Sequence, residues 1–409
     1  MSKNKSNNNN NNNNNNNLIY LDHAASTPVL QEIIDEMIPY LGNLFGNPSS
    51  IHTHGIKSKI AIQIARKRVA ELIGSKPNEI YFTSGGTESN NLALKGICKS
   101  IRNCQKIKNH IITSAIEHDA ILETCKNLEK EGFDVSYLNV DRNGIVDKSD
   151  LKKCLNEKTI LVSIMLANNE IGTTQPIKEL SEIVHNFDKK IIFHSDAVQA
   201  AGKIPINVKE LGVDALSLSS HKMNGPKGVG ALYVRDKVNF EPLIHGGGQE
   251  LTFRSGTENV HGIVGFGKAC EISMRDLKNN SQYMHYLRDF LIEQIKKEIP
   301  NNKLNGSLEY RLPNNVNFTF LGINGEDLLI KLDEDGISAS TGSACSTNRQ
   351  KESHVLKAIG LNYEEIAGSI RFSLGIQNTI EDIEKTIIVL KQRINELLKI
   401  SPLKQKYKE

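Results

Sequence analysis

Apolar residues in this chain follow two patterns, one typical of strands and one typical of helices. Runs such as "EIYFT", "TILVSIML" and "KKIIFHSD" are almost continuously apolar, and each leads into a polar turn. Between such runs lie segments such as "IKSKIAIQIARKRVAELIG", where apolar residues recur three and four positions apart. Short strands that alternate with helices predict an α/β fold with a mainly parallel sheet.

The pattern changes after about residue 260. A long, charged helical stretch runs to about Pro300, and the strand-like runs "NNVNFTFLG" and "SIRFSLG" and a closing helix follow it. We therefore expect a large domain over residues 18–275 and a smaller α+β domain over 276–409. The first strand-like segment, "LIYLD", is expected to contribute to the smaller domain.

Composition narrows the class of protein. The 409 residues are 38% hydrophobic and 24% charged, with a net charge of +3, which gives no sign of nucleic-acid binding. No apolar run approaches the ~18 residues of a membrane span. The six cysteines form no CxxC pair, which favours a reducing compartment.

Residues 1–17 hold an asparagine tract, and we predict a disordered tail there. The tract has no apolar core of a secretory signal, and the first arginine is Arg66, unlike an arginine-rich transit peptide. We expect a cytoplasmic protein, with a mitochondrial location as the alternative.

Polar residues gather where the predicted strands end. In open α/β sheets, ligands bind at the carboxyl ends of the strands, so these residues predict one shared site. They are Thr83 to Thr87, Glu117, His118, Asn168, Asn169, Asp196 and Ser219 to Lys222.

Two of these strand ends suit an anionic and a cationic group of one ligand. "SGGTESNN" leads from a strand into a helix, where glycines and the helix start favour a phosphate, although an ordinary capped helix is an alternative. Asp196 ends a buried run, and a protonated pyridine nitrogen would neutralise it, although it could instead cap the next helix.

Lys222 follows the apolar run "ALSLSSH" and precedes a Gly-Pro-Lys-Gly turn. It is either a solvated lysine of a surface turn or an amine that forms a Schiff base with a carbonyl cofactor. We expect no other amine at this strand end. A phosphate site, a buried carboxylate and a lysine together are what pyridoxal phosphate requires, which favours the Schiff base.

The order of these motifs resembles the cysteine desulfurases of the NifS/IscS type, from Leu18 to about Lys391. The matching motifs are "LDHAASTP", "FGNPSSIH", "FTSGGTESNN", "EHDAIL", "ANNEIGTTQPI", "SDAVQAAGK", "SLSSHKMNGPKGVGALYVR", "HGGGQE", "FRSGTEN", "STGSACS", "SHVLKAIG" and "SIRFSLG". The resemblance implies a fold-type I, pyridoxal-phosphate-dependent homodimer.

The resemblance also implies roles at matching positions. Lys222 would bind the cofactor covalently and Asp196 would pair with its pyridine nitrogen. Gln199 would bond the ring hydroxyl, and His118 would stack on the ring and act as an acid and base. The residues implied for the phosphate are Gly86, Thr87, Ser219, His221 and, across the dimer, Thr257. Those implied for the substrate are Asn169, near the substrate–cofactor adduct, and Arg371, as a clamp for the carboxylate.

Cys345 lies in the polar stretch "STGSACSTNRQKESH", and an exposed cysteine there can act as a thiolate nucleophile. The resemblance implies that it takes sulfur from L-cysteine as a persulfide, releases alanine and supplies a sulfur-acceptor or iron–sulfur scaffold protein. No metal site is expected. The alternatives are a selenocysteine lyase and a non-catalytic scaffold that binds pyridoxal phosphate.

Overall fold

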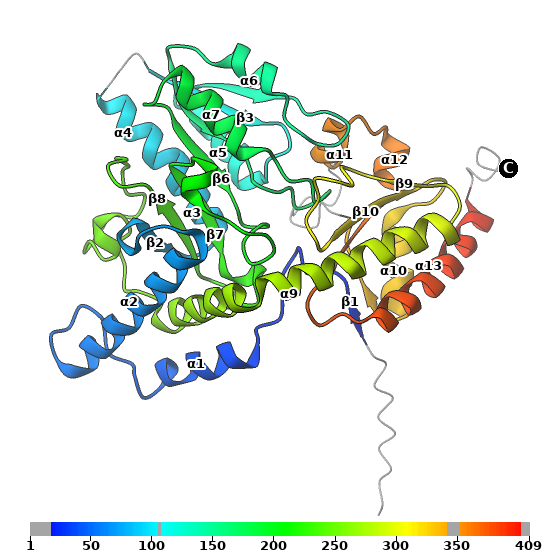
Figure 1. Ribbon diagram of the computed structural model, residues 1–409, viewed down its shortest axis with the longest axis horizontal. Coiled ribbons are helices and arrows are strands. Elements are labelled where there is room, and N and C mark those ends of the chain that lie inside the picture. Colours follow the sequence, from blue (N-terminus) through cyan, green and yellow to red (C-terminus); the bar gives the residue numbers. More distant parts are fainter. Residues whose placement is uncertain (1–17, 105–107, 342–351, 402–409) are drawn as a thin grey trace, which may run out of the picture.

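The computed structural model describes residues 18–104, 108–341 and 352–401. Figure 1 shows a large sheet flanked by helices and a second, smaller sheet beside it, with the long helix α9 (Val260–Glu298) running past both. In this described part of the chain, none of the helices combines the length and the apolar content needed to cross a membrane.

The large sheet has seven strands in the order β2-β8-β7-β6-β5-β3-β4. Only β8 runs antiparallel to its neighbours, which confirms the expected mainly parallel sheet. The carboxyl ends of the other strands therefore share one edge. The strands are β2 (Ile80–Thr83), β3 (His110–Ser114), β4 (Asp134–Leu138), β5 (Thr159–Ser163), β6 (Ile192–Asp196), β7 (Ala215–Ser219) and β8 (Gly230–Val234).

Neighbouring residues of these strands enter different cores because side chains alternate across a sheet. Ile112 and Val162 belong to a core with helices α2 (Thr53–Ile73), α6 (Lys148–Cys154), α7 (Ile177–Phe187) and α8 (Val208–Leu211). Ile111 and Leu161 belong to the opposite core, with α4 (Ile97–Cys104) and α5 (Asp119–Lys130). Burial on both faces explains why the runs read as continuously apolar.

A separate core surrounds the small sheet, in which the strand order is β12-β10-β9 and all pairings are antiparallel. Its strands are β9 (Asn302–Leu304), β10 (Asn315–Phe320) and β12 (Ser369–Ser373), and the helices beside it are α10 (Gly325–Glu334), α12 (Tyr363–Ala367) and α13 (Ile380–Ile400). Helix α11 (His354–Ala358) packs instead in a further small core with Ile116, Met165 and Ile171. The N-terminal β1 (Ile19–Tyr20) pairs with β11 (Ile337–Ser338), and Ile19 packs into this core.

Helix α9 contributes to both cores. Phe266 and Cys270 pack into the large-sheet core, whereas Leu287 and Leu291 pack into the small-sheet core. The predicted domain boundary near residue 275 falls within this continuous helix, so a division of the chain at that point stays a prediction.

Candidate active site

The polar strand ends line one cavity of about 310 Å³. The strands β2, β3, β5, β6 and β7 deliver their carboxyl ends to the same edge, so segments far apart in sequence meet there. Ten of the twelve predicted site residues line it, namely Gly86, Thr87, His118, Asn169, Asp196, Gln199, Ser219, His221, Lys222 and Arg371. The geometry brings them together, and their individual roles stay predictions.

Asp196, at the end of β6, is a buried carboxylate that lacks an ion pair within the described part of the chain. Its Oδ2 accepts a hydrogen bond of 2.6 Å from Asn90 Nδ2, and its Oδ1 accepts one of 2.9 Å from the backbone of Val198. Two neutral donors orient the carboxylate but leave its charge unpaired. The site thus suits a ligand that brings a cation to Asp196.

The loop from β2 to α3 (Gly86–Asn91) forms another wall. Glu88 Oε2 accepts a hydrogen bond of 2.8 Å from the backbone N–H of Ser84, which holds the turn before the helix. A Cβ atom at Gly86 would lie 2.8 Å from Cγ2 of Val198, which also lines the cavity. Only glycine leaves this approach to the helix start open.

Lys222 closes the short helix η3 (Ser220–Lys222) directly after β7 and is 9% exposed. Its Nζ donates hydrogen bonds of 2.6 and 2.7 Å to the carbonyl oxygens of Ala24 and Ala25. Lys222 is therefore held in the cavity wall by the N-terminal segment, and the interpretation of a solvated surface lysine is wrong.

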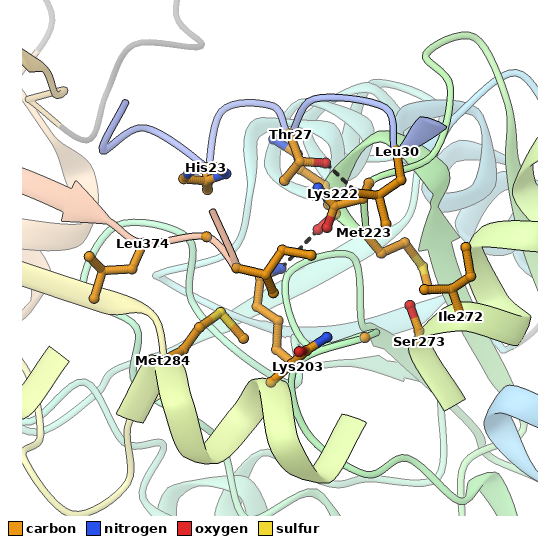
Figure 2. Close-up of a pocket in the computed structure, with 15 residues that line it drawn as sticks. His23, Thr27, Leu30, Lys203, Lys222, Met223, Ile272, Ser273, Met284 and Leu374 are labelled. Carbon is orange, nitrogen blue, oxygen red and sulfur yellow. Dashed lines mark hydrogen bonds between the residues drawn. The ribbon is translucent and has the colours of Figure 1, made fainter. Parts of the chain in front are cut away.

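The expectation that no other amine lies at this strand end is also wrong. Lys203 Nζ donates to the carbonyl oxygen of Lys222 at 3.1 Å and to that of Gln199 at 3.0 Å. Figure 2 shows Lys203 and Lys222 together at a small cavity of about 40 Å³. Burial, and next the charge of Lys222, lowers the pKa of Lys203 to about 7. The turn after β6 carries Lys203 back to Lys222. The two lysines are far enough apart in sequence that no local pattern predicts this contact.

His118 caps the start of α5, where its Nδ1 accepts a hydrogen bond of 3.0 Å from the backbone N–H of Ala120. In the neutral ring, this places the hydrogen on Nε2. The preceding residue, Glu117, is fully buried, and burial raises its pKa to about 8. His118 is therefore held at the start of α5, next to a carboxyl group that is neutral at pH 7.

Arg371, in the middle of β12, brings the small sheet to the same cavity. It is 2% exposed, and its Nη1 donates a hydrogen bond of 3.0 Å to the carbonyl oxygen of Asn169. Its Nη2 forms an ion pair of 2.7 Å with Asp22. The guanidinium is thus fixed between the two sheets.

Two predicted site residues do not line this cavity. Thr257 lies on an exposed loop before α9, and its predicted contact across a dimer stays a prediction. Cys345 lies outside the described residues.

The sequence reasoning missed Asp22, Ala24, Ala25, Asn90 and Lys203. For Asn90 a signal existed, since it follows Gly86 by four residues and lies on the same helix face. Asp22, Ala24 and Ala25 stand in "LDHAASTP", a motif that carried the resemblance without suggesting a contact. Contacts across about 200 or 350 positions leave no local pattern.

Comparison with known proteins gives the family. The chain matches the aminotransferase class-V family over residues 19–386. The cysteine desulfurase IscS of Dictyoglomus turgidum is 52% identical over 390 residues, which are 95% of this chain and 98% of that protein. The cysteine desulfurase IscS of Methanosarcina thermophila is 52% identical over 388 residues, or 95% of each chain.

Solved structures of NifS-like and related proteins resemble this chain in fold as well as in sequence. A NifS-like protein superposes with a TM-score of 0.87 at 40% identity and covers 93% of this chain and 100% of its own. The protein SspA in complex with cysteine has a TM-score of 0.78 at 39% identity, with 88% and 100% covered.

The chain therefore belongs to the aminotransferase class-V family, which confirms the predicted fold-type I architecture. Within this family it belongs with the cysteine desulfurases, and the selenocysteine lyase and the non-catalytic scaffold are not favoured.

Proposed function

We propose that this cysteine desulfurase uses pyridoxal phosphate to take the sulfur from L-cysteine. The products are L-alanine and a persulfide on Cys345, which supplies an iron–sulfur scaffold or another sulfur acceptor. The observation that carries the proposal is the cavity itself, which is lined by a buried carboxylate that has no ion pair among the described residues, by a lysine amine and by an open helix start.

The residues present fit the cofactor. Asp196 would pair with the pyridine nitrogen, Gln199 would bond the ring hydroxyl and Lys222 would bind the aldehyde carbon. The phosphate would be bound by Gly86, Thr87, Ser219 and His221. When bound, pyridoxal phosphate withdraws electrons from the Cα atom of the substrate.

The chain's own residues then handle the protons. The Lys222 amine, next to the carbonyl oxygens of Ala24 and Ala25, would remove the Cα proton and return it to a neighbouring atom. His118 presents Nε2 because Nδ1 is engaged by the backbone of α5, so it can hold or donate a proton at that atom. Arg371 would hold the substrate carboxylate, Asn169 would contact the substrate–cofactor adduct, and both would keep the Cα–H bond in reach of Lys222.

Cys345 would attack the substrate sulfur as a thiolate. The described chain resumes at Glu352, close to the site. Ser353 donates a hydrogen bond of 2.5 Å to the buried Glu170, next to Asn169 in sequence, and His354 Nε2 lies 2.9 Å from the carbonyl oxygen of Glu117. Both contacts attach the segment after Cys345 to the cavity walls, which supports a nucleophile that reaches the substrate.

The deciding experiment is mass spectrometry of the protein after treatment with L-cysteine. We expect one added sulfur on the peptide that holds Cys345, with release of alanine. Cys345→Ser should bind pyridoxal phosphate normally but lose at least about 100-fold in activity, because a hydroxyl is a poor nucleophile at neutral pH.

Cys104→Ser is the matched control, because Cys104 is an exposed cysteine that does not line the cavity. It should leave activity unchanged. Sulfur on Cys104 or another cysteine, or full activity in Cys345→Ser, would refute the assignment. Faster turnover of selenocysteine than of cysteine would instead indicate the lyase, and an inert holoprotein would indicate the scaffold.

We also propose that the protein is a homodimer. Apolar side chains are exposed around α1 (Gln31–Leu41) and α2, among them Ile51 at 94% and Phe45 at 73%. Ile56, Ile60 and Ile64 form a stripe at four-residue spacing along α2. Such a surface favours a second copy of the chain. The cytoplasmic location stays a prediction.

A further inference from the structure

Asp22 contacts the proposed substrate clamp. It follows β1, and its Oδ1 lies 2.7 Å from Arg371 Nη2, an ion pair between residues 349 positions apart. The Asp22 side chain is 18% exposed and that of Arg371 is 2% exposed. Arg371 is therefore buried in the cavity wall, where a charge without a partner is costly, and Asp22 pairs with it from a partly buried position.

The segment around Asp22 is rigidly attached beside Arg371. The backbone N–H of Ser373, two residues after Arg371, donates a hydrogen bond of 2.7 Å to Leu21, and that of His23 donates one of 3.1 Å to Ser373. The N–H of Ala24 bonds Ser373 Oγ at 2.8 Å. Asp22 thus reaches Arg371 from a backbone segment that three hydrogen bonds join to β12.

The contacts of Arg371 leave part of its guanidinium available. Asp22 takes one N–H of Nη2, and the carbonyl oxygen of Asn169 takes one of Nη1. A guanidinium has five N–H donors. The Nε–H is buried and has no partner among the described residues. An unsatisfied donor at the wall of a cavity indicates an acceptor that arrives with the ligand.

We propose that Asp22 is a positioning residue for substrate recognition. Its carboxylate fixes the plane of the Arg371 guanidinium, so that the remaining N–H groups face the carboxylate of the amino-acid substrate. The inference rests on the proposed function, because it takes Arg371 as the clamp for L-cysteine. The guanidinium must be oriented before the substrate binds, because two parallel hydrogen bonds form only when the guanidinium and the carboxylate share a plane.

The test compares two ligands that share an amine and a thiol. L-cysteine carries a carboxylate and cysteamine does not. Binding to the holoenzyme is measured by the change in cofactor absorbance, in a Cys345→Ser background that prevents turnover. Asp22→Asn should weaken L-cysteine binding about tenfold, which corresponds to ~1.4 kcal/mol, and change cysteamine binding less than about twofold.

Two controls isolate the mechanism. Asp35→Asn, on the exposed face of α1, should change neither ligand. In an Arg371→Ala background, Asp22→Asn should add no further loss for L-cysteine, since the double-mutant cycle then has no partner left to position. If Asp22→Asn does not load the cofactor, Asp22→Glu keeps the charge, displaces it by one methylene and should show a smaller loss with the same selectivity.

Equal weakening of both ligands, unchanged or tighter L-cysteine binding, or a full additional loss without Arg371 would each overturn the role of Asp22. Failure of the proposed function gives a different result. In that case, Arg371→Ala alone would leave L-cysteine binding unchanged, or the wild-type protein would release no alanine.

Discussion

Glu117 illustrates how burial sets the chemistry of one side chain beside the site. Its Oε1 accepts hydrogen bonds of 2.6 Å from Ser114 Oγ and 2.9 Å from the backbone of Met165. Its Oε2 is buried and finds no partner within the described residues. Burial outweighs these two hydrogen bonds and raises the pKa to about 8, so the folded protein keeps this carboxyl neutral at pH 7.

Glu117→Gln should therefore change how stability depends on pH. In the unfolded chain the carboxyl ionises near its ordinary pKa of 4.5, whereas in the folded chain it ionises near 8. The folded chain therefore holds one more proton between these pH values. As the pH rises from 4.5 to 8, the free energy of unfolding of the wild type should fall relative to that of the variant by about 1.4 kcal/mol per pH unit. Urea unfolding of the apoprotein across this range measures the difference, with Glu179→Gln on the exposed side of α7 as control. A constant difference between wild type and variant would contradict the raised pKa.

Single residues of the site were predictable where chain topology alone brings them together. Asp196, Ser219 and Lys222 follow parallel strands, and such strands end at one edge whatever their side chains do. Asp22 and Lys203 reach the site through tertiary contacts that no periodicity encodes. Lys203 is buried and Asp22 is partly buried, and the sequence around neither residue predicts that burial.

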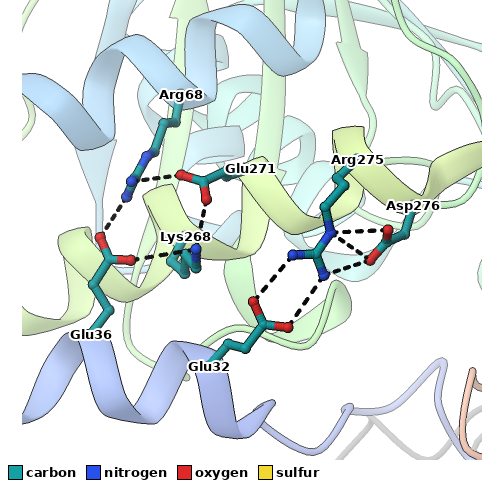
Figure 3. A network of polar contacts seen from close by, with 7 residues as sticks. All are labelled: Glu32, Glu36, Arg68, Lys268, Glu271, Arg275 and Asp276. Atoms are coloured by element: carbon teal, nitrogen blue, oxygen red, sulfur yellow. Dashed lines mark hydrogen bonds and ion pairs between the residues drawn. The ribbon is translucent and has the colours of Figure 1, made fainter.

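At the scale of elements, one group of charges joins α2 to the large sheet and another joins three helices to one another. Arg66 of α2 and Glu250 form a buried pair through two hydrogen bonds of 2.8 Å, and Glu250 also accepts from the backbone of Phe82 in β2. Figure 3 shows a second group, in which Arg68 of α2 bonds Glu36 of α1 and Glu271 of α9, each at 2.6 Å. The first group is buried and the second is partly exposed, so the two groups differ in how much they contribute to the free energy of unfolding.

Glu250→Gln should destabilise the apoprotein by about 3–5 kcal/mol, because it leaves the Arg66 guanidinium buried without its counterion. The shift of the urea unfolding midpoint measures the loss. Glu71→Gln is the control, because it removes an exposed pair with Lys67 at 3.7 Å, and such pairs are worth less than about 1 kcal/mol. Equal effects of the two substitutions would show that the buried pair contributes nothing special.

The sequence predicted the positions of the helices better than the parts of the molecule against which they pack. Helix α2 ends where expected, at Gly74 with a φ of 70°, because glycine adopts this conformation without steric cost. The 39-residue α9 was also visible as one helical stretch. Which core each half of α9 enters depends on its packing partners, which apolar spacing alone does not encode, and the predicted boundary near residue 275 stays a prediction.

At the scale of the whole molecule, the exposed surface of one chain points to a second chain. Ile56, Ile60 and Ile64, which form the stripe on α2, and Thr257 are exposed in a single copy of the chain. The proposed dimer would bury the stripe and would bring Thr257 near the phosphate site of the other subunit. Each active site would then need residues from both chains.

Mixing two inactive variants tests this sharing. Lys222→Ala subunits lack the reactive amine, and Thr257→Ala subunits lack the contact that crosses the interface. In a mixed dimer, the site with an intact Lys222 receives an intact Thr257 from its partner, so that one site per mixed dimer works. Random reassociation of equal amounts makes half of the dimers mixed, and activity should return to about a quarter of the wild-type value.

Lys222→Ala mixed with Asp196→Ala is the control for this recovery. Asp196 and Lys222 line the same cavity of one chain, so every mixed dimer keeps a defect in both sites and should stay inactive. Native mass spectrometry verifies that mixed dimers have formed. Verified mixed dimers of Lys222→Ala and Thr257→Ala that show no activity would place Thr257 outside the shared site. In that case the site of each subunit would be complete within its own chain, and the exposed stripe on α2 would join two independent enzymes.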